Sequence, residues 1–211
     1  DELPSITIGA PVRNRDWILP YYLDHLRKQN YPQDHIRFIF IVNDSMDKSL
    51  QILQGFAKKW QYEYESIDII VKNMRAPEDE RTHRRLQIYR TLAELRNDLL
   101  SRVETDYLFS IDSDILAPPE TLMTLVESNK EIVAGVIRND YIMQPNATYP
   151  NIRTNLLLKQ PNGSFDHYFG YPQNALFEVD VTGAIYLLSR KVCETVRYGY
   201  DPQGEDIYFC M

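Results

Sequence analysis

The sequence predicts an α/β fold with a mostly parallel, mixed sheet, and three observations predict it. Up to about residue 137, short apolar segments alternate with segments whose apolar residues recur at helical spacing, which is the pattern of parallel βαβ units. Residues 36–42 (IRFIFIV) are nearly all apolar, as in a strand that is buried on both faces. The length of 211 residues suits one domain with a sizeable core.

The first predicted strand, residues 5–9, is short and rich in β-branched side chains. Residues 17–29 follow as a helix, with apolar residues at positions 18, 19, 22, 23 and 26. The strand at 36–42 precedes a helix at 47–60, and the next strand spans residues 66–71. The segment 72–85 is highly charged and has no apolar period. We expect a solvated connection there, with a mobile lid as the alternative.

A long helix is predicted at residues 85–102, and a strand at 106–111. Pro118 and Glu120 open another helix, because Pro fits the first helical turn and Glu suits the positive end of the helix dipole. Further elements are predicted as strands at 131–137, on both sides of a turn at 161–163, at 177–181 and at 184–188, and as helices at 191–196 and after Gly204. We therefore expect one domain, 1–211, in which a Rossmann-like half (1–115) is fused to a smaller mixed half (116–211).

Composition excludes some classes of protein. The net charge of −7, from 23 basic and 30 acidic residues, argues against a nucleic-acid partner, which would need a basic surface. No stretch reaches the length of a transmembrane helix and no signal peptide is visible, so we expect a cytoplasmic protein. The chain starts at Asp1 and ends at Met211, and we expect the natural protein to continue. Cys193 and Cys210 are expected to be reduced thiols.

Two carboxylates follow the strand at 106–111. Asp112 and Asp114, one residue apart around Ser113, stand where a buried parallel strand meets a ligand crevice at its carboxyl end. Hard oxygen ligands suit Mg²⁺ or Mn²⁺, and such an ion can in turn hold a diphosphate. The alternative is a pair of solvated loop carboxylates.

The loops after the first two strands are candidates for nucleotide contact, because ligands of open parallel sheets bind at these strand ends. Pro11, Val12 and Arg13 follow the first strand, and a planar guanidinium can stack on a base or bind phosphate. Asp44 follows the second strand and can accept hydrogen bonds from a base or ribose. The alternatives are a solvated Arg13 and an N-cap role for Asp44 or Asp47. No G-x-G-x-x-G or P-loop motif is present.

Two further pairs are candidates. Arg96 and Asn97 lie in the helix before the carboxylate pair, where an arginine suits a diphosphate; an exposed helix arginine is the alternative. Glu205 and Asp206 follow Gly204 at a predicted helix start. They are either compensation of the helix dipole or a carboxylate general base for a poor hydroxyl nucleophile.

In this order, the motifs resemble the inverting nucleotide-sugar glycosyltransferases of the A-type fold, most closely the broad family 2 type. Ala10-Pro-Val-Arg-Asn-Arg is also similar to the Anp1-type mannosyltransferases. The first loop departs from the Ser-x-Asn pattern that is frequent in family 2. The resemblance implies nucleotide contacts by Pro11, Val12, Arg13, Asp44, Arg96, Asn97, Asp112 and Ser113, metal binding by Asp112 and Asp114, and catalysis by Asp206 and Glu205, with Asp206 as the usual base.

The expected activity is therefore a metal-dependent, inverting transfer of a sugar from a UDP- or GDP-type donor to an acceptor hydroxyl. Residues 1–115 would bind the nucleotide sugar and residues 116–211 the acceptor, which is a glycan, a lipid-linked molecule or a protein; Mn²⁺ or Mg²⁺ is the expected cofactor. The alternatives are a sugar-phosphate nucleotidylyltransferase, which should show a Gly-rich first loop, and a nucleotide-sugar-binding domain without catalysis.

Overall fold

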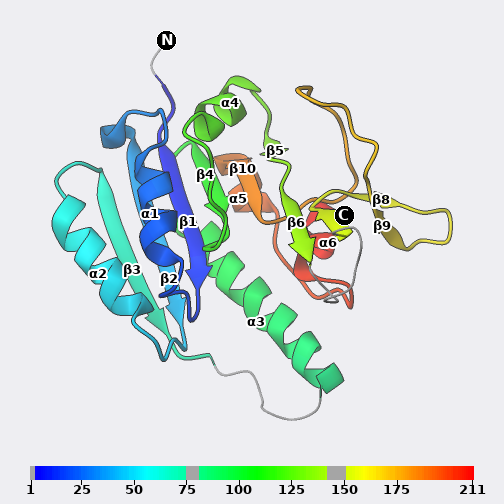
Figure 1. Cartoon of the computed structure of the whole chain (residues 1–211), viewed down its shortest axis with the longest axis horizontal. Helices are drawn as coiled ribbons and strands as arrows, with labels where there is room; N and C mark the ends of the chain where they lie inside the picture. The colour runs from blue at the N-terminus through cyan, green and yellow to red at the C-terminus, as the bar shows by residue number, and fades with distance from the viewer. Residues whose placement is uncertain (1–2, 75–80, 142–150) are drawn as a thin grey trace.

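The computed structural model describes residues 3–74, 81–141 and 151–211, and its centre is a six-stranded sheet in the order β3-β2-β1-β4-β10-β5 (Figure 1). Strands β1 (Ile6–Val12), β2 (Ile36–Asn43), β3 (Ser66–Lys72) and β4 (Tyr107–Ile111) run parallel. Strand β10 (Ile185–Ser189) lies antiparallel between β4 and β5 (Ile132–Ala134). The predicted α/β class with a mostly parallel, mixed sheet is confirmed.

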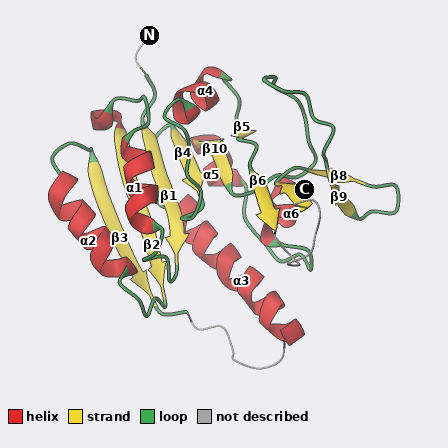
Figure 2. Ribbon diagram, viewed as in Figure 1, coloured by secondary structure: helices red, strands yellow, loops and turns green. Residues whose placement is uncertain are grey.

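Helices cover both faces of the sheet (Figure 2). One face carries α1 (Leu19–Arg27), α2 (Ser49–Trp60) and α4 (Thr121–Glu127), and the other carries α3 (Arg81–Leu100), α5 (Arg190–Thr195) and α6 (Glu205–Cys210). Alternate residues of β2 enter the two cores: Phe38 and Phe40 face one layer, and Ile39 and Ile41 face the other. This confirms the prediction that the apolar run is buried on both faces.

Helix α3 lies unusually close to β1 at Gly9. A Cβ atom added there would stand 2.7 Å from Leu99 Cδ1 and 2.8 Å from the Ile39 carbonyl oxygen. Only glycine allows this approach, because any side chain would displace the helix or the neighbouring strand. The contact positions the end of α3, which carries Arg96, against the sheet.

The second half adds short antiparallel pairs to this frame. Strands β6 (Arg138–Tyr141) and β7 (Asn151–Thr154) form one pair. Strands β8 (Leu157–Lys159) and β9 (Phe165–His167) form the hairpin that was predicted around residues 161–163. A short 3₁₀ turn, Gln33–His35, precedes β2.

The structure corrects three predicted elements. Helix α3 begins at Arg81, so the end of the charged segment 72–85 is helical; residues 75–80 of that segment lie outside the described residues. Arginine is a good helix former, and a charged helix start shows no apolar period. The predicted strand 177–181 contributes only a bridge from Val181 to Leu157. The strand predicted at 131–137 is shorter than expected, because β5 spans only Ile132–Ala134.

Both cysteines are free thiols, as expected. Among the described residues, no helix is both long and apolar enough to cross a membrane.

Candidate active site

The polar residues predicted at the strand ends gather where the parallel strands of the sheet have their carboxyl ends. Strands β1, β2 and β4 are parallel neighbours, so the residues that follow them must emerge side by side. Arg13 Nη2 lies 3.0 Å from Asp44 Oδ2, and Ser113 Oγ donates to the Pro11 carbonyl at 3.3 Å. The carboxyl end of β1 therefore contacts the segments that follow both β2 and β4.

Asp44 is paired with Arg13 and does not cap a helix. Its φ of 49° lies in the left-handed region, which Asp tolerates better than most residues. The role of helix-start acceptor belongs to Asp47, whose Oδ1 accepts from the Ser49 backbone N–H at 2.9 Å. Neither Asp44 nor Asp47 is the N-cap residue, because Lys48 occupies that position of α2 without a side-chain cap bond; Asp47, one residue earlier, is the one whose side chain bonds at the helix start.

Asp112 and Asp114 both remain accessible and both face an arginine. Their side chains are 32% and 38% exposed. Asp112 Oδ1 accepts from Arg96 at 2.9 Å, and Asp114 Oδ2 lies 3.2 Å from Arg15 Nη2. The pair is therefore neither buried nor simply solvated: each carboxylate already stands beside a fixed positive charge.

Arg96 is the buried centre of the site. Its side chain is only 6% exposed, and it donates through Nη2 to Asp112 and through Nε to Glu205 Oε1 at 3.2 Å. Glu205 is 7% exposed, so it does more than balance the dipole of α6. The Asp112 charge foremost, with those of Asp206 and Glu205, raises the pKa of Arg96 well above its ordinary value against the opposing effect of burial. Arg96 is therefore a permanent cation that joins the two acidic segments.

Asn97 has a different role from its neighbour. Its side chain donates to the Tyr198 carbonyl and accepts from the Tyr198 backbone N–H, both at 2.8 Å. This two-way bond holds the segment before α6 against α3. Asn97 thus positions Glu205 and Asp206 indirectly.

Asp206 packs closely against the segment of residues 182–184. The Ala184 carbonyl accepts from the Asp112 backbone N–H at 2.8 Å, and a Cβ added to Gly183 would stand 2.3 Å from Asp206 Oδ2. Tyr186 donates from its hydroxyl to the Thr182 carbonyl and lies 3.3 Å from Asp206 Oδ1. One short segment therefore touches both the Asp-x-Asp motif and Asp206.

Burial shifts the protonation of Asp206. Loss of solvent raises the pKa of its carboxyl to about 7, and the neighbouring Glu205 and Asp112 charges add to the rise while Arg96 opposes it. A carboxyl group with a pKa near 7 can both take and release a proton at neutral pH.

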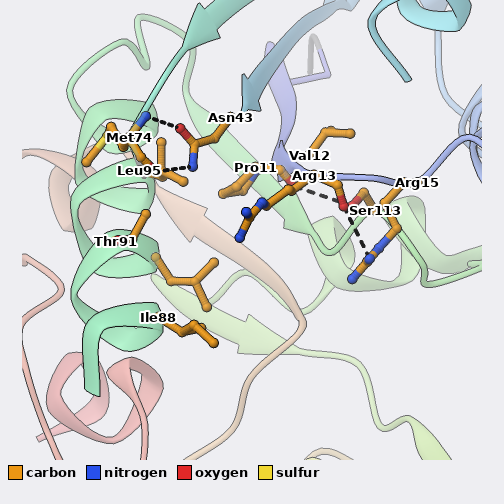
Figure 3. Close-up of a pocket in the computed structure, with 11 residues that line it drawn as sticks. Pro11, Val12, Arg13, Arg15, Asn43, Met74, Ile88, Thr91, Leu95 and Ser113 are labelled. Carbon is orange, nitrogen blue, oxygen red and sulfur yellow. Dashed lines mark hydrogen bonds between the residues drawn. The ribbon is translucent and has the colours of Figure 1, made fainter. Parts of the chain in front are cut away.

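A pocket lies between the strand ends and one side of α3 (Figure 3). Pro11, Val12, Arg13 and Ser113, all predicted as nucleotide contacts, line one wall. Residues that sequence reasoning missed complete the lining: Arg15, Asn43, Met74, Ile88, Thr91, Leu92 and Leu95. Asn43 exchanges two hydrogen bonds with the Met74 backbone, at 2.8 and 3.1 Å, which fixes the segment after β3 at the rim. For the lining residues that lie on α3, the helical spacing of the apolar residues was the only signal in the sequence.

The other predicted nucleotide contacts do not line this pocket but adjoin residues that do; they are Asp44, Arg96, Asn97 and Asp112. A further residue missed from the sequence is Asn155, whose amide nitrogen lies within 3.1 Å of the Gly135 carbonyl, the Thr182 hydroxyl and the Gly183 carbonyl. These bonds join the end of β5 to the segment of residues 182–184 that packs against Asp206. Nothing in the sequence around Asn155 distinguishes it from an ordinary loop amide.

The residues available to a metal are few. In the described ranges, no group of three or more His, Cys, Asp or Glu side chains stands close enough to hold an ion. Asp112 and Asp114 are the carboxylates at the strand end, and each offers hard oxygen ligands of the kind that Mg²⁺ and Mn²⁺ take.

Comparison with known proteins gives consistent results. A family model described as Anp1 matches residues 2–152. A glycosyltransferase 25 family member of Anopheles gambiae is 24% identical over 205 residues, which are 92% of this chain and 34% of the relative. The chain spans about a third or less of the length of the curated relatives that it matches.

Two solved structures show the same fold. S. aureus TarS 1–349 in complex with UDP-GlcNAc has a TM-score of 0.58 at 17% identity, covering 98% of this chain and 52% of the other. The mannosyltransferase PcManGT from Pyrobaculum calidifontis, in complex with GDP-Man and Mn²⁺, has a TM-score of 0.51 at 17% identity, covering 67% and 37%. The predicted glycosyltransferase A-type fold is confirmed.

The family match covers well over half of the chain, and it includes the first loop, Asp44, Arg96 and the Asp-x-Asp motif. It agrees with the resemblance carried by Ala10-Pro-Val-Arg-Asn-Arg. This chain therefore belongs to the Anp1 family.

Proposed function

We propose that this chain is the catalytic domain of a metal-dependent, inverting glycosyltransferase that uses a UDP- or GDP-type sugar donor. One observation carries the proposal: the buried Arg96 guanidinium joins Asp112, at the end of a central strand, to Glu205, the neighbour of Asp206. Carboxylates for a metal and a carboxylate for a proton are thus held in one site. The donors in the similar structures, UDP-GlcNAc and GDP-Man, support a nucleotide sugar and leave the base open.

The pocket between β1, β2 and α3 is the proposed nucleotide site. Its wall combines the apolar side chains of α3 with Arg13, whose half-exposed guanidinium can meet a base or a phosphate. Asp44 holds that guanidinium at 3.0 Å. A flat apolar surface facing a planar cation is a suitable environment for a nucleobase.

Asp112 and Asp114 are the proposed metal ligands. Two carboxylates match the way Mg²⁺ is bound at sites where substrate phosphates and waters complete the coordination. When bound, the ion would neutralise charge on the departing diphosphate as a Lewis acid and template. Arg96 bonds to one oxygen of Asp112, which leaves the other oxygen for an ion. Asp114 becomes available when Arg15 releases it. The two carboxylates therefore fit the proposed ion.

Asp206 is the proposed general base. The acceptor hydroxyl gives its proton to the Asp206 carboxylate as its oxygen bonds to the anomeric carbon, and the bond from that carbon to the diphosphate breaks. A single displacement of this kind inverts the anomeric configuration. The pKa of about 7 suits the task, because a stronger base would stay protonated at neutral pH.

The decisive test is transfer or hydrolysis of a nucleotide-sugar panel with Mn²⁺. Asp206→Asn should lower turnover about 10²–10⁴-fold with little change in donor affinity, since a general base acts in the transition state. Asp166→Asn, at an exposed position in β9, is the matched control. Near-normal turnover of Asp206→Asn, or a product of retained configuration, would refute the mechanism.

The metal assignment has its own test. In calorimetry, Asp114→Ala should lose the part of Mn²⁺ binding that depends on a nucleoside diphosphate, whereas Asp166→Ala should keep it. Unchanged binding by Asp114→Ala would remove Asp114 from the metal site. Activity with nucleoside triphosphate and sugar phosphate instead would favour the nucleotidylyltransferase, and donor binding without turnover would favour an inactive domain.

A further inference from the structure

A trough leads away from Asp114 across the second half of the chain. A cavity of about 480 Å³ begins at Asp114 and is bounded by Ile115–Pro118 and by Gly135–Ile137. A second cavity of about 830 Å³ shares Thr121, Gly135 and Val136 with the first and extends to residues 171–177. Because small-molecule pockets commonly measure about 300–1,000 Å³, the joined space suits an extended ligand.

The floor of the trough is the edge of the sheet. Strand β5 is the last strand in the sheet order, and Figure 1 shows it beside α4. Gly135 donates its backbone N–H to the Ile185 carbonyl, and Glu131 accepts from Ser189. In an antiparallel pair, alternate residues exchange these bonds, so Ile132 and Ala134 direct their N–H and C=O groups outward. Within the described part of the chain, no strand pairs with this outer edge.

The walls of the trough carry little charge. Among the described residues, Glu120 is the single charged residue that lines the larger cavity, and Thr121, Thr124 and Ser128 line it on the α4 side. The opposite wall includes Tyr171 and Phe177, whose rings stack at 6.0 Å between centroids. Such a lining suits an uncharged main chain with small and hydroxyl-bearing side chains better than a phosphate-rich ligand.

We propose that the acceptor is a polypeptide, bound in extended form as an added strand along the outer edge of β5. The outward-directed N–H and C=O groups of Ile132 and Ala134 would supply main-chain hydrogen bonds, and the two joined cavities would take the side chains that alternate along the peptide. The inference rests on the proposed function, because it assigns the acceptor of that same site. A strand added here lies along a space that opens at Asp114, where a hydroxyl side chain would meet the donor.

The test uses amide hydrogen exchange, read by NMR on the 211-residue chain, with a pool of synthetic peptides of about 12 residues containing Ser, Thr and Tyr, roughly 40 Å long when extended. Peptide should slow exchange at Ile132 and Ala134. A pool of the same peptides N-methylated at every second residue should bind at least about fivefold more weakly, because each lost main-chain bond leaves a partner unsatisfied.

A matched pair of variants tests the edge itself. Ala134→Pro removes an outward N–H that pairs with no strand in the described ranges, at an edge position that can accept proline. Ala134→Ser keeps that N–H. Peptide affinity should fall at least about fivefold in Ala134→Pro and stay near normal in Ala134→Ser, with nucleotide binding unchanged in both. If Ala134→Pro does not fold, the N-methylated pool still decides.

Three outcomes would overturn the proposal: peptides that leave both amides unprotected, N-methylated peptides that bind as well as the parents, and protection by an oligosaccharide pool in place of peptides. Nucleotide-sugar hydrolysis is measured on the same samples. Hydrolysis without peptide binding would refute the acceptor assignment alone, and absence of nucleotide-sugar hydrolysis and transfer would refute the proposed function.

Discussion

Replacement of Arg96 by Met should destabilise the fold strongly, because it removes the cation that compensates a buried carboxylate. The Arg96 and Glu205 side chains are 6% and 7% exposed, with Nε and Oε1 at 3.2 Å, and Asp112 is the second partner at 2.9 Å. Removing one member of a buried ion pair costs about 3–5 kcal/mol. For a domain of this size, that loss corresponds to roughly 6–20 °C in melting temperature.

Arg37 is a matched control elsewhere on the same sheet. It also joins two carboxylates, Asp68 at 3.0 Å and Glu104 at 2.7 Å, but it is 21% exposed and its partners are 42% and 77% exposed. Arg37→Met should cost about 1 kcal/mol or less, because solvent screens such pairs. The difference between the two variants isolates the effect of burial.

Urea unfolding at pH 7, followed by circular dichroism, measures both free energies of unfolding. A loss in Arg96→Met no larger than that in Arg37→Met would refute the reasoning. The double variant Arg96→Met with Glu205→Leu should recover part of the loss, since the uncompensated charge is then gone. Without recovery, the loss would come from packing of Arg96 on Tyr198, whose ring centroid lies 5.6 Å from the guanidinium carbon.

Four further predictions concern the site. Because the pKa of Asp206 in the fold is about 7, turnover should fall about tenfold per pH unit below that value, in a profile that Asp206→Asn lacks. The same shift links Asp206 to stability, because its stabilising effect is fully present below the ordinary pKa near 4 and is lost as pH rises to about 7. The free energy of unfolding of wild type, relative to that of Asp206→Asn, should therefore be lower at pH 8 than at pH 4. The same difference between the two proteins at both pH values would contradict the shift. Gly183→Ala should lower turnover at least about tenfold, since the added Cβ would stand 2.3 Å from Asp206 Oδ2; Gly55→Ala in α2, where the space is open, should keep activity and gain up to about 1 kcal/mol. Asp44→Ala should weaken donor binding in calorimetry by releasing Arg13, with an unchanged melting temperature; equal losses of both would indicate a purely structural pair.

The local pattern of the sequence was sufficient for the frame of the molecule. The apolar run at 36–42 had to be covered on both faces, and the helical spacing between strands required parallel crossovers; both features are found in β2 and in the order of β1 to β4. The Asp-x-Asp motif was also found at a strand end, because parallel strands direct their carboxyl ends to one edge. These predictions depend on periodicity and direction alone, which are properties of neighbouring residues.

Strand neighbours and charge partners were decided only by the tertiary structure. The residues 184–188 were predicted as a strand, yet nothing local indicated that β10 would pair between β4 and β5 and separate them. Arg96 resembled an exposed helix arginine or a phosphate ligand, and its burial depends on Glu205, which is 109 positions away. The physical reason is the same in both cases: periodicity reports that a face is buried, whereas the partner on that face is selected by packing between segments that the chain brings together only when it folds.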